Sequence, residues 1–172
     1  IIGSNTSIIS YAMDNESGTQ IRSIAVEYPG EKTEIVATKD WATVSLSLGI
    51  SELASGETMT LRMASEKYSY SMTPFEIGDA LQVIPNDDGT WTIKALQTLT
   101  DYSADLQLKL RYNQNLSEDF EDQVVFTFED SQKIVKINIG QYVEKVPPTE
   151  LVRKVPLGFT SEGRIAWVIY FN

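Results

Sequence analysis

Hydrophobic and polar residues alternate with a period of two along most of this chain, whereas helical periodicity is nearly absent. The clearest example is 105–112, in which three leucines occupy every second position between polar residues. Residues 123–129 and 133–140 alternate in the same way and are joined by a short polar segment. Alternation of this kind is typical of half-buried strands, and the short connection predicts a hairpin.

Further strands are predicted wherever a short apolar or alternating run lies between turn residues. These runs are 7–13, 22–28, 33–38, 42–48, 57–64, 67–72, 80–84, 91–96, 151–159 and 165–171. We expect 57–64 to pair with 67–72, and 80–84 with 91–96 across the turn 85–89. Capping residues predict single helical turns at 73–76 and 117–121.

Strands spaced at this interval predict an all-β fold, an immunoglobulin-like antiparallel β-sandwich. With 172 residues, the chain has room for two small sandwiches in tandem. We place these at 1–75 and 76–172, the second ending in a C-terminal hairpin. The alternative is one large sandwich over 1–172. The last run, 165–171, is apolar on both faces, which predicts a strand covered on both sides or an edge that another strand pairs with.

Composition excludes several classes of function. The chain has no Cys and no His, which removes thiol nucleophiles, disulfides, histidine-based triads and most zinc sites. The formal net charge of −10 opposes binding to nucleic acid. No apolar run is long enough to span a bilayer as a helix. The chain starts at Ile1 without an initiator Met, which is typical of a mature chain whose targeting segment has been removed.

Aromatic residues suggest a ligand-binding surface, because aromatic rings stack on the apolar faces of sugars. Trp41 lies where a turn meets a strand, and Tyr68 and Tyr70 share one face of a predicted strand. These three residues are the candidate binding residues. The alternative is that they are core or rim aromatics of a sandwich, which commonly buries a Trp.

Asn86, Asp87 and Asp88 place three oxygen-bearing side chains before Gly89. Calcium is bound by closely spaced oxygen ligands of this kind. The alternative is an ordinary turn, in which Asn and Asp tolerate unusual backbone angles. No cofactor is predicted apart from calcium at these three residues. Without a nucleophile elbow or a glycine-rich phosphate loop, we expect no enzymatic activity.

One segment resembles a known family. Residues 106–141 contain Leu-Lys-Leu-Arg-Tyr-Asn-Gln-Asn, an acidic connection, Val-Val-Phe-Thr-Phe and a closing Ile-Asn-Ile-Gly-Gln. This series resembles the end of immunoglobulin-like modules, BACON-type domains among them, in surface lipoproteins of gut Bacteroidetes. The resemblance implies a secreted or outer-membrane surface protein, with any lipid anchor outside this chain, and a role in glycan capture or as a spacer.

The sequence therefore predicts a noncatalytic cell-surface or secreted β-sandwich protein. Its expected partners are a glycan or another surface protein, and a spacer role remains open. One alternative is a structural or adhesin-type subunit that assembles by β-strand addition. A second alternative is an accessory domain of a glycoside hydrolase.

Overall fold

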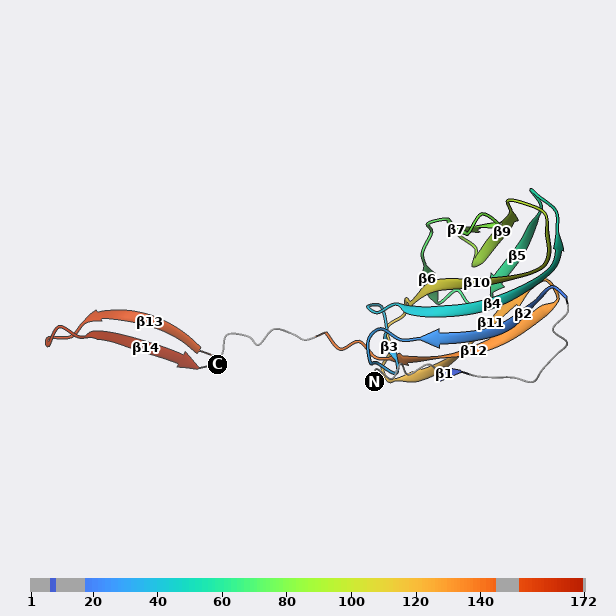
Figure 1. Ribbon diagram of the computed structural model, residues 1–172. Coiled ribbons are helices and arrows are strands. Elements are labelled where there is room, and N and C mark those ends of the chain that lie inside the picture. Colours follow the sequence, from blue (N-terminus) through green and yellow to red (C-terminus); the bar gives the residue numbers. More distant parts are fainter. Residues whose placement is uncertain (1–6, 9–17, 145–151, 172) are drawn as a thin grey trace, which may run out of the picture. The chain divides into compact units, whose positions relative to one another are not determined.

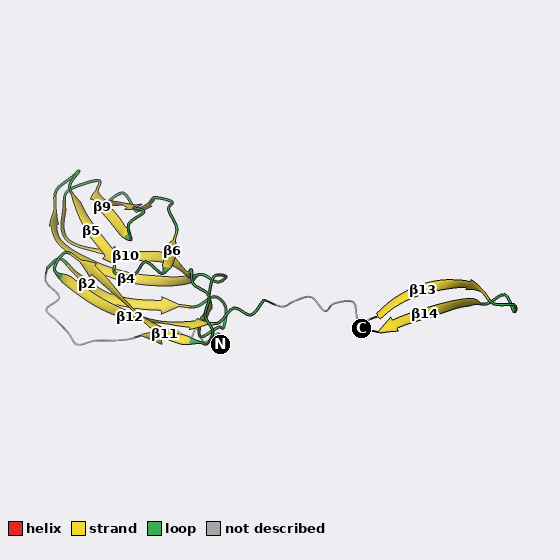
Figure 2. Cartoon of the chain, turned by 180° about the vertical axis from the view of Figure 1, so that it is seen from behind, coloured by secondary structure: helices red, strands yellow, loops and turns green. Residues whose placement is uncertain are grey.

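The computed structural model describes residues 7–8, 18–144 and 152–171, and it is built of β-strands (Figures 1 and 2). None of the residues in these ranges is helical. The all-β sandwich class predicted from the sequence is therefore confirmed. The strands are β1 (Ser7–Ile8), β2 (Gln20–Glu27), β3 (Ile35–Val36), β4 (Ala42–Leu53), β5 (Thr58–Met63), β6 (Tyr68–Tyr70), β7 (Phe75–Ile77), β8 (Leu81–Pro85), β9 (Thr90–Ala95), β10 (Leu99–Tyr112), β11 (Phe120–Phe128), β12 (Ser131–Gly140), β13 (Val152–Phe159) and β14 (Ile165–Phe171).

The chain divides into two compact units, Ile1–Tyr142 and Val143–Asn172. This division differs from the predicted boundary between 1–75 and 76–172. Strands from both sides of residue 75 pair within the same sheets: β4 pairs with β10, and β5 pairs with β9 and β11. The first 75 residues therefore have no sheet of their own.

The first unit contains two sheets. The smaller sheet has the order β1-β2-β4-β10-β6, and the larger has the order β3-β12-β11-β5-β9-β8-β7. All pairings are antiparallel except that of β3 with β12. In both ribbon views, β5 and β9 lie on one side of β4 and β10, and β11 and β12 lie on the other (Figures 1 and 2).

The core follows directly from the alternation in the sequence. In β10, Leu106, Leu108 and Leu110 are at most 3% exposed, while the polar residues between them face outward. The inward residues of β4 and β11 are buried in the same way, and Trp91 of β9 is 1% exposed. The predicted hairpins β8–β9 and β11–β12 are confirmed, the second with a turn of only Glu129 and Asp130.

Local signals misled the prediction at three places. The helical turn expected at 73–76 is instead the start of β7, because Phe75 and Ile77 pair with Val83 and Leu81. The turn expected at 117–121 gives way to β11, which begins at Phe120. The strands 57–64 and 67–72 do not pair with each other, since β5 belongs to the larger sheet and β6 to the smaller. In each case pairing across the sheet outweighs a local preference.

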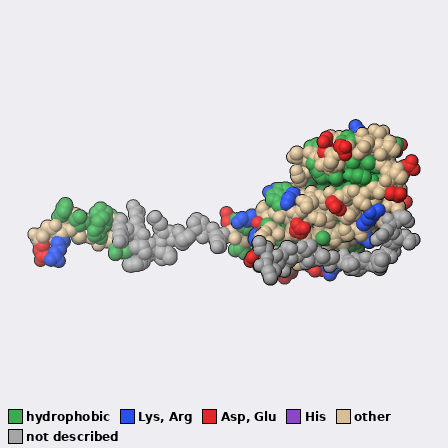
Figure 3. All heavy atoms as spheres, in the orientation of Figure 1, with side chains coloured by type: hydrophobic (Ala, Val, Ile, Leu, Met, Phe, Trp, Pro, Cys, Tyr) green, Lys and Arg blue, Asp and Glu red, His purple; other side chains and the backbone are tan. Residues whose placement is uncertain are grey.

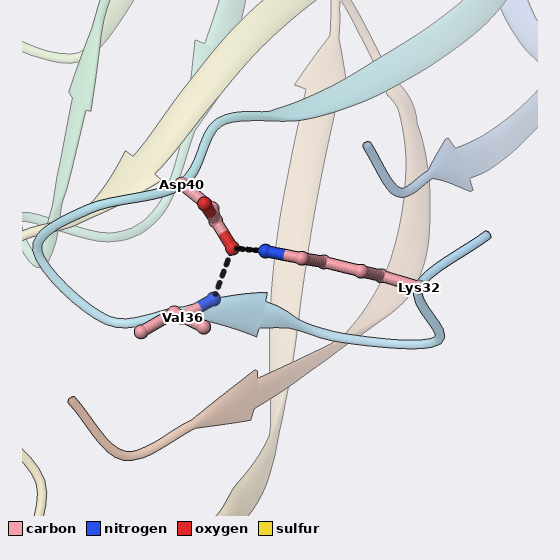
Figure 4. Close-up of polar contacts among 3 residues, drawn as sticks. All are labelled: Lys32, Val36 and Asp40. Carbon is pink, nitrogen blue, oxygen red and sulfur yellow. Dashed lines mark hydrogen bonds and ion pairs between the residues drawn. The ribbon is translucent and has the colours of Figure 1, made fainter. Parts of the chain in front are cut away.

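The loop between β3 and β4 joins the two sheets (Figure 4). Ala37 N donates to the carbonyl of Gly140 in the larger sheet at 2.8 Å, and Thr38 N donates to the carbonyl of Tyr112 in the smaller sheet at 2.7 Å. Figure 4 shows the Asp40 carboxylate closing this loop, where it accepts hydrogen bonds from Lys32 Nζ and, at 3.1 Å, from Val36 N. Partial burial raises the pKa of Asp40, but these two hydrogen bonds and the charges of Lys32 and Lys39 together lower it by more, so the net shift of the pKa is downward.

The second unit is the hairpin of β13 and β14, joined by a turn at 160–164. Thr160 N donates to the carbonyl of Arg164 at 2.7 Å, and Gly163 has a φ of +74°, which a glycine adopts without strain. The exposed fractions of Phe159, Trp167 and Ile169 are 79%, 53% and 45%. The sequence pattern predicted this hairpin correctly, and among the described strands β14 pairs with β13 alone.

Candidate functional site

A cleft of about 650 Å³ opens in the first unit where the end of β5, the β5–β6 loop, β6 and the β8–β9 turn come together. It brings together four of the six candidate residues, Tyr68, Tyr70, Asp87 and Asp88. The full lining consists of Arg62, Met63, Ala64, Ser65, Glu66, Tyr68, Tyr70, Asp87, Asp88 and Gly89. Segments that are distant in sequence thus form one concave surface.

Tyr70 connects the predicted aromatic site to the predicted acidic turn. Its hydroxyl donates to the carbonyl of Asn86 and accepts from the backbone N of Gly89 at 2.8 Å. Its ring centroid lies 4.7 Å from that of the buried Trp91, and the ring itself is half-buried. Tyr70 is therefore fixed at both ends of its side chain while part of it remains accessible in the cleft.

Tyr68 lines the same cleft but belongs to the core. It is only 4% exposed, its hydroxyl donates to Asp122 Oδ2 at 2.8 Å, and its ring meets that of Tyr112 edge to face at 5.3 Å. Burial raises the pKa of Tyr68, and the hydrogen bond and charge of Asp122 raise it further. The side chain supports the floor of the cleft and offers little surface on which a ligand can stack.

The β8–β9 turn uses two of its three candidate metal ligands for internal hydrogen bonds. Asn86 Nδ2 donates to Thr90 Oγ1 at 2.9 Å and to Thr92 Oγ1 at 3.1 Å. Asp88 Oδ1 accepts from Thr90 Oγ1 at 2.6 Å and from Thr90 N at 3.2 Å, and the hydroxyl bond lowers the pKa of Asp88. Asp87 is exposed. This pattern is that of an ordinary turn held by Asn and Asp side chains.

Among the described residues, no group of three or more acidic side chains lies in an arrangement that could hold a metal ion. The other acidic cluster, at 118–122, is also occupied by structural contacts. Asp119 accepts from Gln141 N at 2.9 Å, Glu121 pairs with Lys136 at 2.8 Å, and Asp122 accepts from Tyr68. Four acidic side chains of the two loops are therefore engaged in contacts within the fold, Asp88, Asp119, Glu121 and Asp122.

Trp41 lies on the opposite face of the smaller sheet from the two tyrosines. Tyr70 pairs with Leu110, whose side chain is buried, so both point toward the core. On its other side, Leu110 pairs with Ala42, and Trp41 is the residue before Ala42, so its side chain lies on the outer face. There it packs against Arg111, whose guanidinium lies 4.8 Å from the Trp41 ring centroid. Trp41 is 37% exposed. The three aromatic candidates therefore form two separate surfaces.

Arg62 and Glu66 are cleft residues that the sequence analysis missed. Both are exposed, and Arg62 lies close enough to Asp88 for its charge to help lower the pKa of that carboxylate. Neither belongs to a motif, and the pairing of β5 with β9 in the larger sheet is what brings Arg62 opposite Thr90, next to the turn. The cleft thus combines one guanidinium, three carboxylates, the edge of a tyrosine and backbone amides.

The fold and the cleft together define an all-β sandwich-like module with a cleft in its first unit. None of the described residues forms a helix long and apolar enough to cross a membrane. No family model matches the chain, and no curated protein matches it significantly.

Several solved structures share the fold. A serine-rich repeat adhesion glycoprotein, Srr1, of Streptococcus agalactiae superposes with a TM-score of 0.55 and 11% identity, covering 84% of this chain and 53% of its own. The serine-rich repeat protein Srr2 of the same organism superposes with a TM-score of 0.51 and 10% identity, covering 87% of this chain and 55% of its own. A third match comes from a structure of manganese lipoxygenase of Gaeumannomyces graminis with partial zonadhesin of Komagataella pastoris. The matching chain superposes with a TM-score of 0.53 and 13% identity, covering 87% of this chain and 53% of its own. The chain thus spans about half the length of each, and at these identities the likeness concerns the fold.

Proposed function

We propose that this chain is a noncatalytic, adhesin-type module of the cell surface that binds a glycan or a similar polyhydroxylated ligand in the cleft around Tyr70. The observation that carries the proposal is the convergence of an anchored aromatic ring with charged and backbone donors and acceptors at one concave surface. In small-molecule sites, a few placed polar groups beside apolar or aromatic surface fix the orientation of the ligand.

The character of the side chains favours recognition over catalysis. Asp88 accepts hydrogen bonds from Thr90, and the hydroxyl of Tyr70 is engaged by two backbone groups, so both side chains hold the turn that forms the wall of the cleft. Arg62, Glu66 and Asp87 are exposed and able to exchange water for the hydroxyl groups of a sugar. Hydrogen bonds to such charged groups are the stronger ones, of about 1.5–3 kcal/mol.

Two further observations support a surface location and an adhesive role. Two of the structures that share this fold are described as a serine-rich repeat adhesion glycoprotein and a serine-rich repeat protein. The resemblance of 106–141 to immunoglobulin-like modules of Bacteroidetes surface lipoproteins favours the same location, whether outer membrane or secreted. A spacer role is the alternative, and it predicts that the cleft binds nothing.

A glycan array followed by calorimetry on the hits tests the proposal. We expect Arg62→Ala and Asp87→Ala each to weaken binding about tenfold, equivalent to about 1.4 kcal/mol, because each removes an exposed charged partner from the cleft. Both side chains are on the surface, so the unfolding free energy should stay within about 0.5 kcal/mol of the wild type.

The matched control is Trp41→Ala, which removes an exposed aromatic side chain from the opposite face of the sheet. The affinity of the Trp41→Ala variant for the glycan should equal that of the wild type. Loss of binding in Trp41→Ala with unchanged affinity in Asp87→Ala would move the site to the Trp41–Arg111 surface. Absence of any glycan hit would favour the spacer role.

A further inference from the structure

One long edge of strand β10 is unpaired. β10 pairs with β4 from Leu99 to Leu110, but it pairs with β6 only from Leu110 to Tyr112. Continuing the register of β6 by one residue would put Ser71 opposite Lys109, yet the chain there leaves the smaller sheet and leads to β7 in the larger one. Along 103–109, no described strand pairs with β10 on the β6 side.

Hydrogen bonds at the end of β10 show which of its backbone groups face this edge. Tyr112 O accepts from Thr38 N on the β4 side, whereas Asn113 N donates to Lys67 O on the β6 side. In a strand, the N–H and C=O groups of successive residues point to alternate sides. The backbone groups of Asp105, Gln107 and Lys109 therefore point toward the unpaired edge.

An apolar pocket lies beside this edge. Its volume is about 220 Å³, and its lining includes the side chains of Tyr70, Phe75, Trp91 and Leu108. Figure 3 shows hydrophobic side chains gathered in a hollow between β7 and β10. An extended segment added to β10 would carry every second side chain toward this pocket, which has room for one large apolar group.

The same chain contains a strand with the complementary features. β14 has seven residues, so it fits within the eleven residues 99–109 of β10 that no described strand pairs with on the β6 side, and it pairs only with β13 among the described strands. Ile165, Trp167 and Ile169 alternate along it and are 54%, 53% and 45% exposed. A lone two-stranded hairpin is marginally stable in water, so β14 gains from a further strand and from cover for its apolar face.

Charge favours contact between the second unit of one copy and the first unit of another copy. The first unit, 1–142, holds 21 of the 24 acidic and 10 of the 14 basic side chains, which gives a formal charge of −11. The second unit, 143–172, holds three acidic and four basic side chains, which gives +1. Two first units repel each other because both carry a large negative charge. The hairpin of another copy approaches a first unit without this electrostatic repulsion.

We propose that β14 of a second copy adds to the unpaired edge of β10, with Trp167 seated in the pocket of Tyr70, Phe75, Trp91 and Leu108. Backbone hydrogen bonds to Asp105, Gln107 and Lys109 supply affinity, and the pocket fixes the register. Repeated head to tail, this contact builds a chain of copies; exchanged reciprocally, it closes a dimer.

Mass measurements on the full chain over a wide concentration range test the proposal. The wild type should shift from 19.3 kDa to multiples of that mass as concentration rises. Gln107→Pro removes an outward N–H from the acceptor edge, where Pro is tolerated because the edge is unpaired. Trp167→Asp places a charge where the donor strand needs an apolar group. Each variant alone should stay at 19.3 kDa.

Mixing the two variants gives the decisive result. Gln107→Pro retains an intact β14 and Trp167→Asp retains an intact edge, so the mixture should form a one-to-one heterodimer and nothing larger. The matched control Trp41→Asp changes an exposed Trp outside both surfaces and should associate like the wild type. Circular dichroism confirms that each variant is folded.

Hydrogen exchange of the Gln107 amide provides a readout independent of the substitutions. In the wild type, this amide should become protected as the mass increases. A wild type that stays at 19.3 kDa at all concentrations overturns the proposal. Protection of the Gln107 amide without any change in mass also overturns it, because the occupant would then be the chain's own hairpin. Association that persists in folded Gln107→Pro would place the contact elsewhere.

Discussion

Tyr68 and Tyr70 are separated by one residue and carry the same side chain, but their surroundings differ. Both point to the inner side of the smaller sheet, since they pair with Tyr112 and Leu110. Tyr68 lies within the core against Tyr112, whereas Tyr70 reaches the β8–β9 turn at the rim of the cleft. A shared face therefore does not give a shared role, because depth below the rim of the sandwich differs between the two positions.

Tyr68→Phe should reduce stability by about 1–3 kcal/mol near neutral pH, because it leaves the half-buried carboxylate of Asp122 without its donor. The raised pKa of Tyr68 also gives the wild type a pH dependence. The contribution of Tyr68 to the unfolding free energy is present in full below pH 10.0, the ordinary pKa of tyrosine. It is lost as the pH rises toward the raised pKa of Tyr68 in the folded protein.

The difference in unfolding free energy between wild type and Tyr68→Phe should therefore shrink as pH rises above about 10. Urea unfolding at a series of pH values measures it. A constant difference across that range would show that Tyr68 ionises as easily in the folded protein as in the unfolded chain.

At the scale of the elements, the β3–β4 loop donates backbone hydrogen bonds to both sheets, and it contains a residue in an unfavourable conformation. Thr38 has a φ of +62°, in the left-handed region that β-branched residues rarely adopt. The loop accepts this cost because Ala37 N and Thr38 N donate to carbonyls of different sheets. The ion pair of Lys32 with Asp40 and the bond from Val36 N then fix the same loop from within.

Thr38→Asn should raise the unfolding free energy by about 0.5–1 kcal/mol, because Asn tolerates the left-handed region and keeps the backbone N–H. Thr33→Asn is the matched control: Thr33 is exposed, precedes the same loop and has no positive φ, so its stability should change by less than about 0.5 kcal/mol. Urea unfolding midpoints measure both. A destabilised Thr38→Asn would mean that the Thr side chain makes the larger contribution.

At the scale of the whole molecule, the hydrophobic core belongs to the first unit. Every buried apolar side chain of the described residues lies between Ile21 and Ile139, in strands that pair across residue 75. The hairpin residues whose burial is described, 155–169, add none. The first unit is therefore expected to be the folding unit, with the hairpin carried at its C-terminal side.

A chain ending at Tyr142 should thus unfold with a free energy within about 0.5 kcal/mol of the intact chain, since it keeps every buried apolar side chain that the structure describes. A chain ending at residue 75 should not fold, because β4 loses β10 and β5 loses both β9 and β11. Circular dichroism and urea unfolding compare the two. A cooperative transition in the shorter fragment would support the boundary at residue 75 predicted from the sequence.

Much of the fold was predictable because strand patterns are local. The leucines of β10 and the alternation of β11 and β12 identified those strands and the side that each buries. The candidate site was only partly predictable: Tyr70, Asp87 and Asp88 were chosen as two unrelated features, and Arg62 and Glu66 have no motif. Trp91 and Trp167 both lie in runs that the sequence predicts as strands, yet Trp91 is 1% and Trp167 53% exposed.

The sequence by itself determined the strand class, the alternating inner and outer faces and the turns, since these depend on residues a few positions apart. Only the tertiary structure decided which strands pair, that Trp41 and Tyr70 lie on opposite faces, and that Tyr70 meets the turn at Asn86. The physical reason is that local periodicity records whether a side chain prefers burial, whereas strand order depends on hydrogen bonds and packing between segments far apart in the chain.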